Sequence, residues 1–297
     1  MAHTDHLAMR RVLRREIACT IGLLTDDQDF RTMRRYRSFT FDDHTAYLQQ
    51  VEALLRTRAA QGGHTTVALF DPEEFAAFCA GTGLDPDTPA SRSRYTAELA
   101  ATGPNLPYDG RPLGEIVPDL VDEAVRQATW EYAATLLTRL GPCAACGEDI
   151  GRAAFTRASD LLTRILATAP PGERHLVCSI RSTPESLLAV LHADTEATRT
   201  AQLDEAEVLE FTTVLALGLA TSSPGGLVLR ASTPGIPDRV YGWRLRGDAL
   251  APLTAGEVFD AYCTDVETGD PISPEPGVDY GAPPDLGDDG PAPGHRR

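Results

Sequence analysis

Helical spacing of apolar residues alternates with short continuous apolar runs along this chain, which predicts a mixed α/β fold. Residues 43–61 carry apolar side chains three and four positions apart, as one face of a helix does. The run Thr66–Phe70 is short and apolar, as in a buried strand. The sequence Asp-Pro-Glu-Glu at 71–74 follows, and a capping acid, a first-turn proline and a glutamate together predict another helix.

The same order recurs in the second half of the chain. His175–Ile180 is predicted to be a strand, and Ser-Thr-Pro-Glu at 182–185 resembles a helix start, so we expect a helix after it. Leu227–Arg230 and Val240–Arg246 alternate as the strands of a hairpin do. The predicted fold class is therefore helix-rich α/β, with a small central sheet of βα units, a C-terminal β-hairpin and packed helices.

The longest helix is predicted from about Pro118 to Leu140. One of its faces carries Val121, Val125 and Tyr132, and a second carries Trp130. A helix that is apolar on two faces is typical of a buried, central position.

Three regions follow from composition. In residues 266–297, 13 of 32 residues are proline or glycine, so this acidic tail is predicted to be disordered. Residues 1–33 are predicted to form a basic, partly flexible arm, and Met33 is an alternative translation start. Residues 34–265 are predicted to form a single α/β globular domain.

Charge and residue usage exclude several function classes. All 27 basic residues are arginine, and without lysine there is no Walker A phosphate loop and no pyridoxal Schiff base. The net charge of −16 disfavours nucleic acid as a partner. No run approaches the roughly 18 apolar residues of a membrane span, and no export signal is evident, so we expect a cytoplasmic protein.

A Cys-x-x-Cys sequence is the sharpest motif in the chain. Cys143 and Cys146 are separated by two residues, which suits one metal ion, a reversible disulfide, or two thiols that merely pack. A structural zinc needs further ligands, and the nearest candidates, His175 and Cys178, would point to opposite faces of a strand. A zinc shared across a dimer is a further alternative, so zinc is the one cofactor that the sequence suggests.

A second candidate site comes from the expected strand ends. In open α/β sheets, ligands bind beyond the carboxyl ends of the strands. Asp71 lies at one such end, and Arg181, Ser182 and Thr183 lie at the other. An arginine beside a helix N-terminus suits a small anionic ligand.

No convergent acid, base and nucleophile is evident in the sequence. The leading hypothesis is therefore a cytoplasmic, non-catalytic interaction or regulatory protein that binds a protein partner or itself. The alternative hypothesis is a small-molecule enzyme or anion-binding protein with its site at the strand ends.

Overall fold

The chain divides into two compact units. The computed structural model describes residues 19–182, 186–194, 202–265 and 267–286. Unit 1 is Met1–Val125 and unit 2 is Arg126–Arg297, and each has a hydrophobic core of its own. Helices hold 46% of the residues and strands 23%, which confirms the helix-rich α/β class. The predicted single domain, 34–265, extends across both units, and its boundaries stay a prediction.

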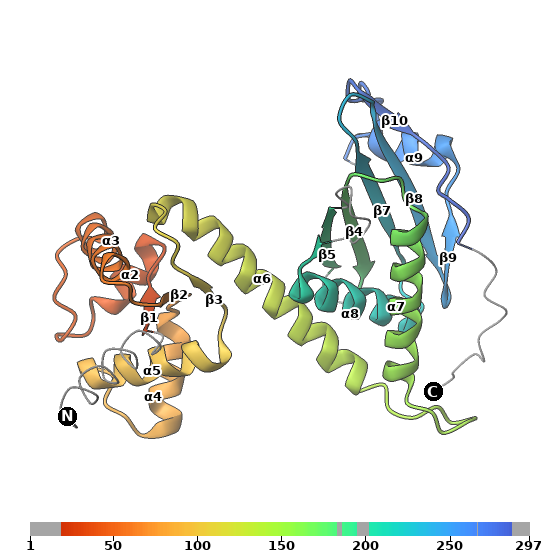
Figure 1. Ribbon diagram of the computed structural model, residues 1–297. Coiled ribbons are helices and arrows are strands. Elements are labelled where there is room, and N and C mark those ends of the chain that lie inside the picture. Colours follow the sequence, from red (N-terminus) through yellow and green to blue (C-terminus); the bar gives the residue numbers. More distant parts are fainter. Residues whose placement is uncertain (1–18, 183–185, 195–201, 266, 287–297) are drawn as a thin grey trace, which may run out of the picture. The chain divides into compact units, whose positions relative to one another are not determined.

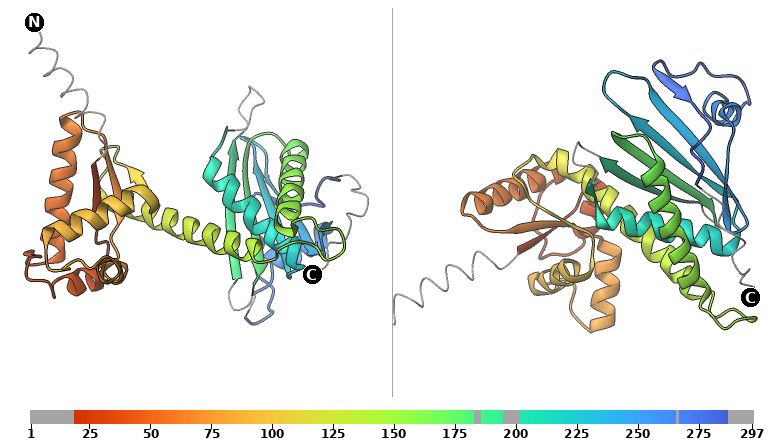
Figure 2. Two further views of the ribbon diagram at one scale, coloured as in Figure 1. Left: turned by 90° about the horizontal axis from the view of Figure 1, so that it is seen from below. Right: turned by 45° about the vertical axis from the view of Figure 1, so that its right-hand side comes forward.

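Unit 1 is a small sheet with helices on both sides (Figures 1 and 2). Its strand order is β1-β2-β3, with β1 parallel and β3 antiparallel to β2. In chain order its elements are β1 (Cys19–Leu23), α2 (Asp27–Met33), α3 (His44–Ala60), β2 (Thr65–Leu69), α4 (Pro72–Thr82), α5 (Pro89–Thr102) and β3 (Asn105–Pro107). Helix α3 packs on β2, and α5 packs on β1 and β2.

The helix start predicted at residues 71–74 is confirmed by its cap, and α3 and α5 begin in the same way. The side chains of Asp43, Asp71 and Thr88 accept hydrogen bonds from backbone N–H groups of α3, α4 and α5. The predicted flexible arm is wrong for residues 19–33, because they form β1 and α2. Phe30 and Met33 of α2 are buried in the core, so this segment belongs to the fold.

Helix α6 (Leu113–Thr138) extends from unit 1 into unit 2. Leu120 near its start belongs to the unit 1 core, and Leu137 near its end belongs to the unit 2 core. The prediction of a helix buried on two faces is wrong, because Val125 is 60% exposed and Val121 and Tyr132 are also exposed. The middle of α6 contributes to neither core.

Unit 2 is a mixed sheet with α7 and α8 on one face, while the short helix α9 packs on β8 and β10 (Figures 1 and 2). The strand order is β10-β8-β7-β4-β5-β6, and β9 pairs with β8. In chain order the elements after α6 are α7 (Ile150–Thr168), β4 (Glu173–Arg181), β5 (Ser186–Asp194), β6 (Gln202–Leu203), α8 (Glu205–Thr221), β7 (Gly225–Ser232), β8 (Asp238–Arg246), β9 (Ala249–Pro252), α9 (Ala255–Tyr262) and β10 (Val278–Tyr280). The predicted β7–β8 hairpin is confirmed.

The helix expected after Ser182 is wrong. Residues 186–194 form β5, which pairs antiparallel with β4 along its whole length. The leucines and alanines of this segment suit a helix, but the sheet buries Leu187, Ala189 and Leu191 on one face. Packing on the sheet therefore overrides local propensity, and the expected second βα unit is a β-hairpin.

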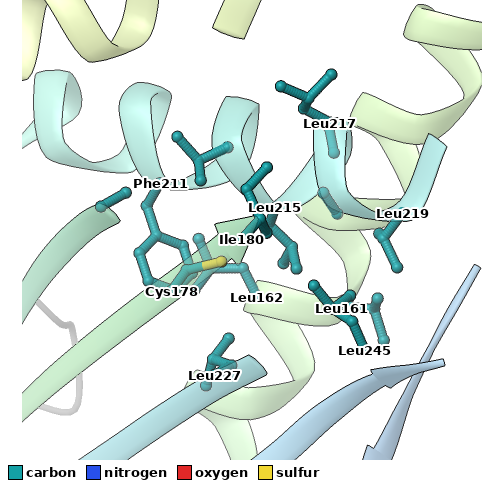
Figure 3. Close-up of a cluster of buried hydrophobic side chains, with 14 of the residues drawn as sticks. Leu161, Leu162, Cys178, Ile180, Phe211, Leu215, Leu217, Leu219, Leu227 and Leu245 are labelled. Atoms are coloured by element: carbon teal, nitrogen blue, oxygen red, sulfur yellow. The ribbon is translucent and has the colours of Figure 1, made fainter. Parts of the chain in front are cut away.

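The core of unit 2 lies between the sheet and the helices α7 and α8. Residues alternate between buried and exposed along β4, so one face of the sheet is apolar and packed. Figure 3 shows Phe211 of α8 beside Cys178 of β4. Gly218 allows α8 to approach closely, because a Cβ there would lie 2.7 Å from Ile180 Cγ2.

The predicted disorder of the tail is wrong for the part that the structure describes. Val278–Tyr280 forms β10, which pairs parallel with β8. The Gly281 N–H donates to the Val240 carbonyl at 3.0 Å, and the ring of Tyr280 contacts Phe259 edge-on. Proline and glycine do not prevent this segment from docking on the sheet.

Candidate functional site

A cleft of about 850 Å³ lies on unit 2 where β4, β5 and β7 present their polar side chains. Its lining combines carboxylates, imidazoles and guanidinium groups: Glu173, Arg174, His175, His192, Ala193, Asp194, Leu203, Asp204, Glu207, Arg230 and Ser232. These residues come from four strands and the start of α8. The strand register brings them together, since His175 lies opposite His192 on β5 and opposite Arg230 on β7.

Two histidines stack face to face in the cleft. The ring centroids of His175 and His192 are 4.6 Å apart and the planes differ by 17°. Burial lowers the pKa of His175, and His192 beside it lowers that pKa further. Arg230 acts in the same direction, while Glu207 opposes it. Two stacked imidazolium ions would repel each other, so the fold favours a neutral His175.

Glu207 fixes the orientation of His192. One carboxylate oxygen of Glu207 accepts a hydrogen bond from the backbone N–H of His192 at 2.8 Å, and the other lies 3.1 Å from His192 Nδ1. Glu207 is held in the first turn of α8, where Asp204 caps the helix by accepting from the Glu207 N–H. The remaining ring nitrogen of His192, Nε2, is thereby presented away from Glu207.

The guanidinium groups of the two arginines in the cleft already donate hydrogen bonds to other residues. Arg230 donates to Asp238 at 2.7 Å and, through both terminal nitrogens, to Glu275 at 2.8 and 3.0 Å. These carboxylates raise the pKa of Arg230, the Glu275 hydrogen bonds most strongly. Arg174 is buried, and its guanidinium donates to three carbonyls, those of Leu166 and Ala169 in the last turn of α7 and of Pro170 beyond it. Arg230 is thus paired with carboxylates, whereas the donors of Arg174 are occupied by carbonyl oxygens.

Two carboxylates of the cleft remain without a cation. Glu173 and Asp194 lie directly opposite each other at the ends of β4 and β5. Both side chains are exposed, and within the described parts of the chain neither makes a hydrogen bond or an ion pair. Like charges directly opposite each other destabilise a sheet, so a positive group bound here would relieve the repulsion.

One pair of residues in the cleft has the form of an acid–base site. A carboxylate that orients an imidazole is found in acid–base sites, and His192 with Glu207 has this form. The hydroxyl among the described lining residues belongs to Ser232, which hydrogen-bonds Asp238 and not a histidine. The cleft therefore has a candidate base but no activated nucleophile beside it.

The residues predicted for an anion site belong to different units, Asp71 to unit 1 and Arg181 to unit 2. Asp71 caps α4 in unit 1, where it accepts from the N–H groups of Glu73 and Glu74. Arg181 ends β4 in unit 2, and its N–H donates to the Pro224 carbonyl. Ser182 follows the end of β4, and Thr183 lies outside the described residues. Since β5 replaces the expected helix, the helix dipole invoked for this site is missing there.

The Cys-x-x-Cys pair lies in the turn between α6 and α7. Cys143 is buried and Cys146 is exposed, and the turn is closed by the Gly147 N–H, which donates to the Cys143 carbonyl at 2.8 Å. Across the described ranges, no three His, Cys, Asp or Glu side chains gather where they could hold a metal ion. Zinc at this pair stays a prediction.

The pairing of His175 with His192 was not predicted from the sequence. The pairing could have been recognised from the sequence. In an antiparallel hairpin the numbers of two paired residues have a constant sum, so a hairpin centred between Thr183 and Pro184 places the two histidines opposite each other. The helix expected for 186–194 hid this pairing. Glu207 carried no signal beyond its place near a helix start.

Fold and site together define the class of this chain as a two-unit α/β protein with an acidic, histidine-containing cleft on unit 2. Residues 8–111 match the model of a family described as a domain of unknown function, DUF8829. The match covers about a third of the chain and stops before unit 2, so the cleft lies outside it. No curated protein and no solved structure matches the chain. Among the described helices, none has the length and apolar character to cross a membrane.

Proposed function

We propose that this chain is a cytoplasmic, non-catalytic interaction protein that binds a positively charged segment of a protein partner in the unit 2 cleft. The observation that carries the proposal is the pair Glu173 and Asp194, two opposed carboxylates without a cation. Arginine side chains suit such a pair, because a guanidinium can donate to two carboxylate oxygens at once. The net charge of −16 also favours encounter with a basic partner.

The neighbouring residues support the same class of ligand. The stacked imidazoles of His175 and His192 offer a flat surface on which a guanidinium plane can lie. Burial favours the neutral form of His175, so this ring does not repel a cation at neutral pH. Arg230 is neutralised by Asp238 and Glu275.

The proposal is tested by fluorescence anisotropy with a labelled Gly-Arg-Gly-Arg-Gly peptide amide and its glutamine counterpart. The full chain is expected to bind the arginine peptide and not the glutamine peptide, with weaker binding as salt rises. The double variant Glu173→Gln, Asp194→Asn should weaken binding about tenfold or more, because charge-assisted hydrogen bonds are lost.

The matched control is the double variant Asp260→Asn, Glu267→Gln, which removes two exposed carboxylates of unit 2 away from the cleft lining. This variant is expected to bind as the unchanged protein does. Equal weakening by the control and the Glu173→Gln, Asp194→Asn variant would mean that only net charge matters. Equal binding of the two peptides would refute the proposal.

A further inference from the structure

A second cavity, of about 220 Å³, lies in unit 1 at the carboxyl ends of the parallel strands β1 and β2. This edge of an α/β sheet is where ligands characteristically bind. Four aromatic side chains dominate its wall, those of Phe39, Phe41, Tyr47 and Phe70. All of the lining residues fall inside the segment 8–111 that matches the domain model. The cavity is thus a feature of unit 1 and is independent of the unit 2 cleft.

The floor of the cavity is fixed by the end of β1. The Tyr47 hydroxyl accepts from the Leu24 N–H at 3.2 Å and lies 3.3 Å from the Gly22 carbonyl, to which it donates. Burial raises the pKa of Tyr47 to about 12, so the hydroxyl stays neutral. A Cβ on Gly22 would lie 2.8 Å from Phe70 Cδ2, so the glycine keeps this part of the cavity open.

The rim of the cavity is fixed by Ser38. Arg92 of α5 donates to the Ser38 hydroxyl at 2.7 Å and to its carbonyl at 2.9 Å, and Asp87 accepts from the Ser38 N–H at 2.7 Å. Three hydrogen bonds from residues some fifty positions away hold the segment that carries Phe39 and Phe41. The aromatic wall is therefore formed before any ligand arrives, which reduces the ordering cost of binding.

Arg92 supplies the charge. Its guanidinium is half-buried, and burial lowers its pKa while Asp87 opposes that shift. Within the described chain it has no carboxylate at ion-pair distance. A half-buried cation without a paired anion favours a ligand that carries a negative charge. The adjoining hydroxyl of Thr96 also lines the cavity.

We propose that the unit 1 cavity binds a single-ring aromatic carboxylate, with the ring against Phe39, Phe41 and Phe70 and the carboxylate at Arg92. The size fits one ring, since pockets for larger, drug-sized ligands begin at about 300 Å³. Offset or edge-on contacts with the aromatic wall would orient the ring, and the guanidinium would select the acid over a neutral analogue.

The test uses the full chain and three probes: benzoate, benzyl alcohol and acetate, with binding followed by ligand-observed NMR titration. Benzoate is expected to bind at least about tenfold more tightly than benzyl alcohol, because a charge-assisted hydrogen bond adds to ring burial. Acetate should not bind at the same concentrations. Benzoate binding no tighter than that of benzyl alcohol would overturn the proposal.

Two variants locate the site. Arg92→Gln keeps a hydrogen-bond donor near Ser38 and should weaken benzoate binding about tenfold, whereas Arg94→Gln, on the exposed side of the same helix, should leave it unchanged. If Arg92→Gln loosens unit 1, Phe41→Leu gives a second test, since loss of a half-buried wall ring should weaken both benzoate and benzyl alcohol. Benzoate binding that is unaffected by Arg92→Gln and Phe41→Leu in the folded protein would also overturn the proposal.

Discussion

Phe211→Ala is expected to lower the free energy of unfolding of unit 2 by about 3–5 kcal/mol, the usual cost of removing a fully buried aromatic side chain. Phe211 has no exposed surface, and its ring lies against the apolar face of β4 beside Cys178 (Figure 3). The close approach of α8 to the sheet leaves the cavity little room to collapse, so most of the packing energy should be lost.

Hydrogen exchange followed by mass spectrometry gives the measurement, because it reports each unit separately. Amides of β4 and β7 should exchange much faster in the variant, while those of α3 and β2 in unit 1 should be unchanged. The control is Leu209→Ala on the same helix, where the side chain is 41% exposed and a loss below about 1 kcal/mol is expected. Equal losses from the two substitutions would contradict the assigned core.

Truncation of the chain after Asp270 should lower the free energy of unfolding of unit 2 by about 2–4 kcal/mol. Several hydrogen bonds and aromatic contacts are lost, and each contributes about 1 kcal/mol net. The deletion removes β10 and the carboxylate of Glu275 that pairs with Arg230. It also removes Tyr280, whose ring contacts Phe259 and Tyr262. Thermal unfolding of the full and truncated chains provides the comparison.

The matched control for this truncation removes only residues 287–297, which leaves every described contact of β10 and Glu275 in place. Its midpoint should stay close to that of the full chain. If the longer truncation were as stable as the control, the docking of residues 271–286 on β8 would contribute nothing measurable. The composition-based prediction of a disordered tail would then be correct for these residues after all.

Local sequence signals predicted the helices of this chain better than its sheet. Asp71 was identified as a cap because a capping side chain and its N–H partners lie within three residues of each other. The capping box of Thr254 and Glu257 at the start of α9 is local in the same way. Such interactions can be recognised without knowledge of the tertiary fold.

The secondary-structure predictions were wrong where a segment pairs with residues far away in the sequence. Ser186–Asp194 has residues that suit a helix, but β4 supplies a partner for every backbone group along one edge. Residues 271–286 are rich in proline and glycine, yet β8 pairs with Val278–Tyr280 and Arg230 donates to Glu275. Neither partner could be inferred from the segment itself.

The candidate cleft could not be predicted for the same reason. His175, His192 and Arg230 become neighbours only through the register of three strands, and Glu207 only through the position of α8. The predicted site at Asp71 and Arg181 assumed two βα units, so it depended on the helix that the structure replaces with β5. The composition showed that the chain is acidic. It did not show that two carboxylates would face each other on adjacent strands.

The central claim is that the unit 2 cleft holds the positively charged group of a partner. Photo-crosslinking tests it most directly, with an arginine peptide that carries a benzophenone side chain between its two arginines. Crosslinks are expected to concentrate at residues 173–194, 203–207 and 230–232. They should largely disappear in the Glu173→Gln, Asp194→Asn variant. Crosslinks that fall mainly on unit 1, or that persist unchanged in this variant, would contradict it.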